Sequence, residues 1–166
     1  NDYAAVIEGQ IAENIDIALY GPSSFARALM NGAKIDAFAM QVNKDGTKAY
    51  YSVMYVKADA PYTKLEDLKG KNLGLVDPNS TSGNNVPRFE MNKMGIKPEE
   101  FFANVVYTGS HENAVIALAQ QHDLSPGQVS KITVGLGPAP AQTLRYDAPR
   151  NGLEARFSLG VKKVQF

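Results

Sequence analysis

The sequence contains no cysteine, so it has no disulfide bridge, no thiolate metal ligand and no cysteine nucleophile. It also has no net charge, because 17 lysines and arginines balance 17 aspartates and glutamates. Proteins that hold nucleic acid or anionic membrane by bulk charge need a basic excess, so we expect no nucleic-acid partner. No apolar run approaches the roughly 20 residues that a membrane-spanning helix requires. Any anion site must therefore be local.

What the sequence does contain is typical of a globular protein. Its 166 residues are 44% hydrophobic, enough to bury a core without covalent crosslinks. Fourteen glycines and nine prolines fall well short of a low-complexity composition. The length fits one ordinary domain or two small lobes.

Predicted helices and strands alternate over the first 120 residues. Apolar spacing and end signals predict helices at residues 3–11, 22–30, 111–120, about 84–94, and a short one from a capping box of Thr63 and Glu66 to about residue 70. Short apolar runs predict strands at residues 17–20, 35–42, 50–56, 72–76 and 131–136, and one within 101–107, with a turn at 43–47. The alternation predicts an α/β fold with a mostly parallel sheet and flanking helices.

The best local signal for a site is Ser80-Thr81-Ser82-Gly83, which stands between a predicted strand and a predicted helix. Hydroxyl groups, free backbone N–H groups and the positive end of a helix dipole converge there, which suits phosphate, phosphonate, sulfate or carboxylate. A Walker A loop is excluded because Gly-Lys-Ser/Thr is missing. Ordinary N-capping by Ser or Thr explains the same string, so both interpretations stay open here.

A histidine and two tyrosines are further candidates. His111 begins a predicted helix and can donate to an anion, or it is an exposed residue of a capping segment. Tyr20 ends a predicted strand at the edge where α/β sheets bind ligands, and Tyr50 lies on the next long strand; core packing is the alternative for each. His122 completes no metal-ligand spacing with His111, and no catalytic triad or carboxylate pair stands out. We therefore expect binding without catalysis and without a metal or cofactor.

Residues 2–120 strongly resemble the PhnD-like phosphonate- and phosphate-binding proteins of ABC importers. The strings that carry the resemblance are YGPSSFARAL, DGTKAYYSVMYVKADAPYTKLEDLKGKNLGLVDPNSTSGNNVPR and VVYTGSHENAVIALAQ. The resemblance implies truncated lobes of the type II periplasmic-binding-protein fold, a periplasmic location, an ABC-transporter permease as partner and a phosphonate or phosphate ligand between the lobes. It also implies ligand contacts from Ser80, Thr81, Ser82 and His111, with Tyr50 and Tyr20 lining the cleft.

Residues 121–160 resemble a different family. The string HDLSPGQVSKITVGLGPAPAQTLRYDAPRNGLEARFSLG is similar to part of the MmgE/PrpD family, which includes 2-methylcitrate dehydratase. The two resemblances together divide the chain into a partial first lobe with a crossing strand (1–56), a second lobe with the oxyanion site (57–120) and a foreign C-terminal segment (121–166). We expect the strand at 131–136, or a homodimer that exchanges strands or lobes, to cover an open sheet edge.

Three functional interpretations follow. The first is a non-catalytic binder of phosphonate or phosphate, derived from the receptor of an ABC importer. The second is a fragment of a dehydratase-family enzyme, which rests on the C-terminal segment alone. The third is a rearranged chimera that has kept no binding activity.

Overall fold

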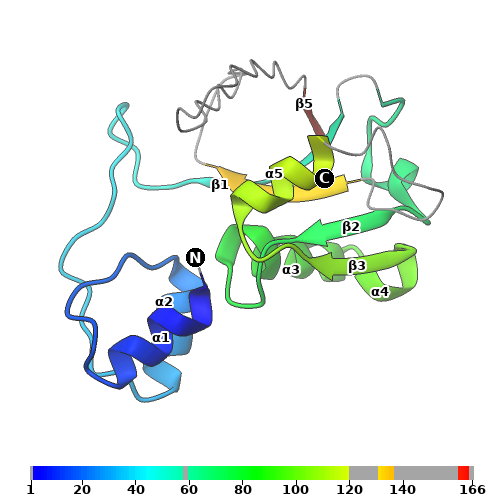
Figure 1. Ribbon diagram of the computed structural model, residues 1–166. Coiled ribbons are helices and arrows are strands. Elements are labelled where there is room, and N and C mark those ends of the chain that lie inside the picture. Colours follow the sequence, from blue (N-terminus) through cyan, green and yellow to red (C-terminus); the bar gives the residue numbers. More distant parts are fainter. Residues whose placement is uncertain (1, 58–59, 120–130, 137–160, 165–166) are drawn as a thin grey trace, which may run out of the picture.

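The computed structural model describes residues 2–57, 60–119, 131–136 and 161–164 (Figure 1). Its helices are α1 (Tyr3–Ile11), α2 (Pro22–Met30), α3 (Val86–Lys93), α4 (Pro98–Phe101) and α5 (His111–Ala119), with a 3₁₀ turn η1 (Leu65–Leu68) and a π-helical turn η2 (Thr81–Asn85). Its strands are β1 (Tyr51–Lys57), β2 (Asn72–Leu75), β3 (Asn104–Tyr107), β4 (Lys131–Leu136) and β5 (Val161–Val164). No helix within the described residues is long and apolar enough to cross a membrane.

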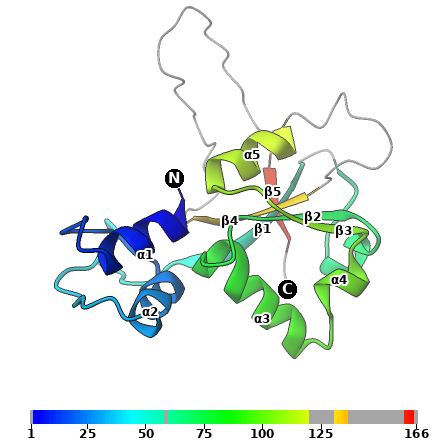
Figure 2. The same cartoon turned by 60° about the horizontal axis from the view of Figure 1, so that its bottom comes forward.

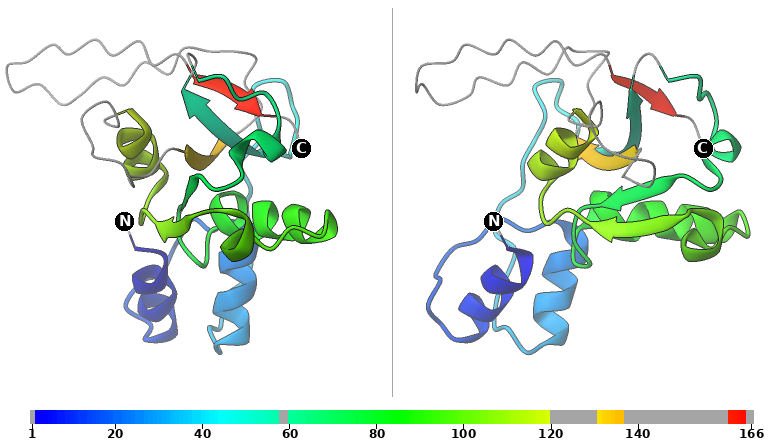
Figure 3. Two further views of the ribbon diagram at one scale, coloured as in Figure 1. Left: turned by 90° about the vertical axis from the view of Figure 1, so that its right-hand side faces the viewer. Right: turned by 45° about the vertical axis from the view of Figure 1, so that its right-hand side comes forward.

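Helices α1 and α2 form a small unit of their own, the α1–α2 unit (residues 2–42). The carboxylate of Asp2 accepts hydrogen bonds from Ala4 N and Ala5 N and so begins α1, while Pro22 stands in the first turn of α2. Ile7 of α1 packs against Ala28 of α2 in a small apolar cluster. Figure 3 shows the two helices side by side beneath the sheet.

The remaining elements form the sheet unit (residues 51–119, with β4 and β5). Among the described residues the strand order is β3-β2-β4-β1-β5. β2 pairs parallel with β3 and with β4, whereas β1 pairs antiparallel with β4 and with β5. The expected α/β class is confirmed. The strand at 131–136 exists, and it pairs with both β2 and β1, so it occupies an edge that each of these strands would otherwise leave open.

Helices cover both faces of the sheet. In Figure 2, α5 lies on one face and α3 and α4 lie on the other. Alternate residues of β1 serve the two faces: Met54 and Val56 are fully buried in the larger core with Met91 of α3, and Tyr55 packs against Leu118 of α5. This three-layer packing fixes the start of α3 and of α5 relative to the sheet.

Three local predictions differ from the structure. Residues 17–20 and 35–42 belong to no strand; their backbone is not in a ladder, and Leu19 and Phe38 are exposed. The helix after Thr63 is only the turn η1, and the side chain that accepts from Thr63 N is Asp67 rather than Glu66. The N-cap of η1 is Lys64, one residue later than expected, so the third residue after the cap is Asp67 and not Glu66. The strand β5 was not expected from the sequence.

Candidate functional site

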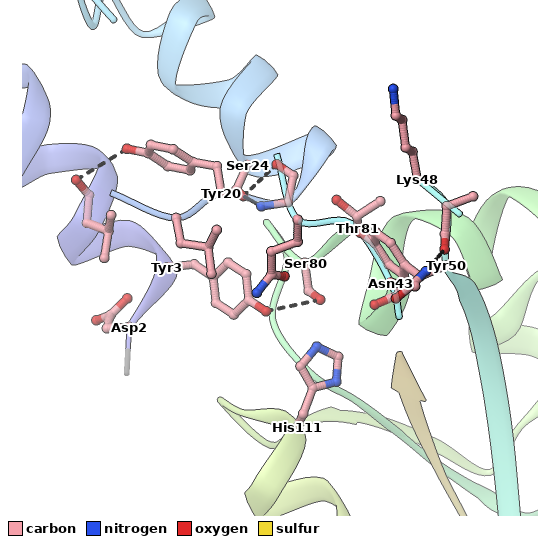
Figure 4. A pocket seen from close by; sticks show the side chains of 16 residues that line it. Asp2, Tyr3, Tyr20, Ser24, Asn43, Lys48, Tyr50, Ser80, Thr81 and His111 are labelled. Atoms are coloured by element: carbon pink, nitrogen blue, oxygen red, sulfur yellow. Dashed lines mark hydrogen bonds between the residues drawn. The ribbon is translucent and has the colours of Figure 1, made fainter. Parts of the chain in front are cut away.

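A cavity of about 720 Å³ lies between the α1–α2 unit and the sheet unit (Figure 4). All six residues singled out in the sequence line it: Tyr20, Tyr50, Ser80, Thr81, Ser82 and His111. They come from segments that are up to 91 residues apart in the chain, so the fold and not the sequence brings them together. Whether each touches a ligand stays a prediction.

The loop after β2 places the three hydroxyl residues. Ser80 is buried, and its Oγ accepts a hydrogen bond of 3.1 Å from Gly83 N, so Ser80 is the N-cap of η2. η2 continues directly into α3, and together they form one helical run from Thr81 to Lys93. Capping is thus observed at Ser80, and it leaves the hydroxyl proton as a donor, so contact with an anion stays a prediction.

Gly83 is the residue that lets this loop fold back so tightly. A Cβ at Gly83 would overlap the side chain of Val76 and lie 2.9 Å from Ser80 Oγ. The carbonyl of Gly83 also accepts from Val76 N at 2.9 Å. The glycine thus holds the N-terminus of η2 against the end of β2, where the cavity begins.

Thr81 and Ser82 are held by different parts of the chain. Thr81 Oγ1 accepts a hydrogen bond of 2.8 Å from Ser23 N at the start of α2. The carbonyl of Ser82 accepts one of 2.6 Å from Ser52 Oγ on β1. The hydroxyl triplet is thus fixed between α2 and the crossing strand β1.

His111 is the first residue of α5 and lies across the cavity from Ser80 in Figure 4. Ser110, the residue before it, caps the helix, since Ser110 Oγ accepts from Asn113 N at 3.0 Å. Burial lowers the pKa of the His111 imidazole below its usual value of 6.5, because desolvation disfavours the charged form. His111 is therefore chiefly neutral near pH 7, when it can donate one N–H to a ligand.

The two tyrosines differ in how they meet the cavity. The Tyr20 hydroxyl donates to the carbonyl of Val6 at 3.5 Å, and its ring packs edge-on against Phe25 with centroids 6.2 Å apart. Burial raises the pKa of the Tyr20 phenol. Core packing, the alternative from the sequence, thus describes much of Tyr20, whereas the Tyr50 side chain is 42% exposed at the rim of the cavity.

The sequence did not single out Asp2, Tyr3 or Lys48, which also line the cavity. The Tyr3 hydroxyl donates to Ser80 Oγ at 3.4 Å. In the sequence Tyr3 looked like one apolar position of a helix face, and only its place in the first turn of α1 could have indicated otherwise. Asp2 is the one carboxylate among the described lining residues, and it caps α1.

Four helix N-termini meet at this cavity. Its lining includes Tyr3 at the start of α1, Gly21 before α2, Thr81 at the start of the η2–α3 run and His111 at the start of α5. Each N-terminus carries partial positive charge, although side chains already bond some of the first-turn N–H groups, and the three other than α1 have no lining carboxylate. No group of three or more His, Asp or Glu side chains that could hold a metal occurs in the described part of the chain. The geometry therefore suits an anion.

A three-layer α/β sheet beside a second small unit, with a cavity between them, is the architecture of the type II periplasmic-binding-protein fold. Comparison with known proteins narrows this class. A family model described as the periplasmic phosphonate-binding substrate-binding protein of ABC transporters matches residues 1–123, and the chain belongs to this family.

Individual relatives agree with the family assignment. The phosphonates-binding periplasmic protein of Escherichia coli is 33% identical over 135 residues, which cover 79% of this chain and 40% of that protein. The phosphate-import protein PhnD of Mycolicibacterium smegmatis is 32% identical over 127 residues, which cover 72% of this chain and 40% of that protein. Among solved structures, the binding-protein component of an ABC phosphonate transporter from Pseudomonas aeruginosa superposes with a TM-score of 0.67 at 33% identity, covering 81% of this chain and 44% of that one. The chain thus spans about two fifths of the length of these relatives.

Proposed function

We propose that this chain binds a tetrahedral oxyanion, a phosphonate or phosphate, in the cavity between the α1–α2 unit and the sheet unit, and that it does so without catalysis. The observation that carries the proposal is the meeting of four helix N-termini at one cavity. Backbone N–H groups and dipole ends favour an anion there. The names of the relatives, which refer to phosphonate and phosphate, support the choice of anion.

Each hydroxyl residue has a role in the proposal. Ser80, Thr81 and Ser82 donate hydroxyl and backbone hydrogen bonds to the oxygens of the anion, and His111 donates from the opposite side. Charge-assisted hydrogen bonds of this kind contribute roughly 1.5–3 kcal/mol each. Tyr50 and Tyr20 line the cleft, where Tyr50 meets the organic substituent and Tyr20 supports the wall.

The cellular setting follows from the family. We propose that the chain derives from the periplasmic receptor of an ABC importer and that the importer's permease is its partner. In this assignment residues 1–56 are a partial first lobe with the crossing strand, and residues 57–120 are the second lobe that carries the oxyanion site.

The C-terminal segment has a separate origin in this proposal. Residues 121–160 derive from an MmgE/PrpD-type sequence, and residues 121–166 form a foreign segment. The family match that ends at residue 123 supports a junction near Gln120 and Gln121. Because Ile17, Leu19 and Phe38 expose 73%, 76% and 81% of their surface, we also propose that two copies associate through strand or lobe exchange.

Isothermal titration calorimetry tests the binding proposal. The purified chain is titrated with 2-aminoethylphosphonate, methylphosphonate and phosphate, with acetamide as an uncharged control. We expect saturable heat and a raised melting temperature with at least one of the three anions. No heat and no thermal shift with any of them at millimolar concentration would refute the proposal.

A further inference from the structure

One hydrogen bond joins the hydroxyl triplet to the α1–α2 unit at short range. Ser23 N donates to Thr81 Oγ1 at 2.8 Å, across 58 residues of sequence. Ser23 is the second residue of α2, so its N–H has no acceptor within its own helix. Thr81 supplies that acceptor from the other unit.

This approach is possible because residue 21 has no side chain. A Cβ at Gly21 would lie 2.9 Å from Thr81 Oγ1 and 3.6 Å from the Tyr50 hydroxyl. The backbone at Gly21 has φ −79° and ψ 160°, a conformation that any residue adopts. Glycine is therefore needed at this position for the contact between the units and not for the shape of the chain.

The other two members of the triplet are held differently. Ser80 Oγ caps its own helix and meets Tyr3 of α1 only at the longer distance of 3.4 Å. The Ser82 carbonyl is bound by Ser52, which belongs to the sheet unit. Thr81 is thus the member whose hydroxyl makes a short bond across the cavity.

A threonine hydroxyl has two acceptor positions and one proton. The bond from Ser23 uses an acceptor position and leaves the Thr81 proton for a ligand in the cavity that Thr81 lines. The two hydrogen bonds act on one oxygen. The Ser23 N–H polarises the Thr81 O–H, and an anion that accepts from Thr81 makes Thr81 Oγ1 a better acceptor for Ser23. Each of the two bonds therefore strengthens the other.

We propose that the Thr81 hydroxyl couples anion binding to the docking of the α1–α2 unit on the sheet unit, and that Gly21 is the residue that permits this docking. The inference rests on the proposed function, since it concerns the same cavity. Coupling of this kind is reciprocal: the factor by which the anion strengthens docking equals the factor by which docking strengthens anion binding. A change at Gly21, which donates nothing to the anion through a side chain, must then weaken binding.

The absence of cysteine makes the docking directly measurable. Met30, 79% exposed at the end of α2, and Met94, 45% exposed just after α3, are replaced by cysteine and carry spin labels. Double electron–electron resonance then reports the distance between the units, with and without methylphosphonate. Thr81→Val, Gly21→Ala and the conservative Thr81→Ser are each introduced into this labelled chain, and calorimetry gives their affinities.

We expect one narrow distance distribution in the parent chain, a broader or longer one in Thr81→Val and Gly21→Ala, and the parent distribution in Thr81→Ser. The affinity for methylphosphonate should fall at least about tenfold in Thr81→Val and in Gly21→Ala, the factor for one charge-assisted hydrogen bond. The variant that combines Gly21→Ala with Thr81→Val should lose little more than Thr81→Val alone, because Thr81→Val already removes the docking contact that Gly21→Ala disturbs. Thr81→Ser should bind as the parent does.

Two results overturn the inference, and a third overturns the proposed function. Parent-like distances in Thr81→Val and Gly21→Ala show that the contact does not dock the units. Parent-like affinity in Gly21→Ala, with a changed distance, shows that docking and binding are independent. If the parent itself gives no heat with methylphosphonate, phosphate or 2-aminoethylphosphonate, the proposed function fails and the coupling fails with it.

Discussion

The hydroxyl of Tyr3 donates to Ser80 Oγ at 3.4 Å, so the first helical residue of the chain reaches the N-cap of a helix 77 positions later. Ser80 thereby receives hydrogen bonds from Tyr3 and from Gly83 N on one oxygen. Its proton is left as the group that can meet an anion in the cavity.

Removing two hydroxyls of the triplet should abolish binding. In Ser80→Ala with Thr81→Ala, two charge-assisted bonds worth roughly 1.5–3 kcal/mol each are lost, so calorimetry should detect no heat with phosphonate. The cap at Ser80 adds a stability cost of about 1 kcal/mol, which thermal melting reports separately. The control is Thr47→Ala, which removes a hydroxyl group from an exposed turn. This variant should bind phosphonate as the parent chain does. Unchanged affinity in the double variant would place the site elsewhere.

Gly83→Ala should destabilise the fold, since the added methyl group overlaps Val76. Overpacking of this kind costs about 1–3 kcal/mol, measured as a shift of the urea midpoint. Val76→Ala in the same chain makes room for the methyl group, so the double variant should lose less than the sum of the two single losses. Additive losses would show that the loop moves away instead.

Burial of His111 makes stability depend on pH. Because its pKa is lowered in the folded state, the unfolded chain binds more protons than the folded chain as the pH falls through 6.5. The contribution to stability is complete above that value and is lost as the pH falls to the lowered pKa. We expect the free energy of unfolding to drop as the pH falls below the usual pKa of 6.5, and to drop less in His111→Gln.

A bound oxyanion should act on His111 in the opposite direction. Its negative charge favours the imidazolium and raises the pKa, so binding takes up a proton between the free and bound pKa values. NMR titration of the His111 ring with and without methylphosphonate measures both values, and His111→Gln identifies the resonance. A pKa that does not move on saturation would place the anion away from His111.

The side chain of Asn84, a residue of η2, accepts hydrogen bonds from two other side chains. Its Oδ1 accepts from Arg88 Nε at 2.9 Å and from the Tyr107 hydroxyl at 3.1 Å, and Arg88 also pairs with Glu99 at 2.6 Å. That hydrogen bond from Arg88 lowers the pKa of the Glu99 carboxyl. Tyr107→Phe should cost about 1 kcal/mol in the parent chain and little in Asn84→Ala, as urea denaturation of the four chains measures.

The control for this cycle is Glu99→Gln, since Glu99 is 61% exposed and exposed ion pairs contribute only about 0–1 kcal/mol. Equal costs of Tyr107→Phe in both backgrounds would mean that the bond to Asn84 adds nothing to stability.

The exposed apolar residues of the α1–α2 unit should drive association of two copies. Met40→Lys places a charge on this surface, where Met40 is 60% exposed, and should reduce a concentration-dependent rise in sedimentation coefficient. The control is Phe89→Lys. Phe89 lies on α3 and is 61% exposed, and its replacement should leave association unchanged. A parent chain that sediments as a monomer at all concentrations would refute the homodimer.

Local signals predicted much of this fold. Both ends of α1 and of α2 agree with the sequence, because caps such as Asp2 and first-turn residues such as Pro22 act within a few positions. The runs at 17–20 and 35–42 look like strands, but a ladder also needs a partner, and the sequence does not state which segment supplies it. β5 was missed for the same reason, since its place is defined by pairing with β1.

The residues that line the cavity were predictable to a similar degree. Ser80, Thr81, Ser82 and His111 stand out because hydroxyl groups or a histidine follow a strand and begin a helix, which is a local pattern. Tyr3 gave no such signal, because its importance depends on the contact with Ser80 across the fold. The bond from Ser23 to Thr81 was equally invisible, since a backbone N–H has no mark in the sequence.

The position of β4 has a consequence for any shortened version of this protein. A chain cut at residue 120 would keep almost all of the residues that the family model matches. It would nevertheless lose β4, the strand between β2 and β1. The loop bearing Ser80 extends from β2, and Tyr50 precedes β1, so the two walls of the pocket would no longer share a backbone ladder. Residues 131–136, whatever their ancestry, therefore join the two halves of the sheet that carry the pocket walls.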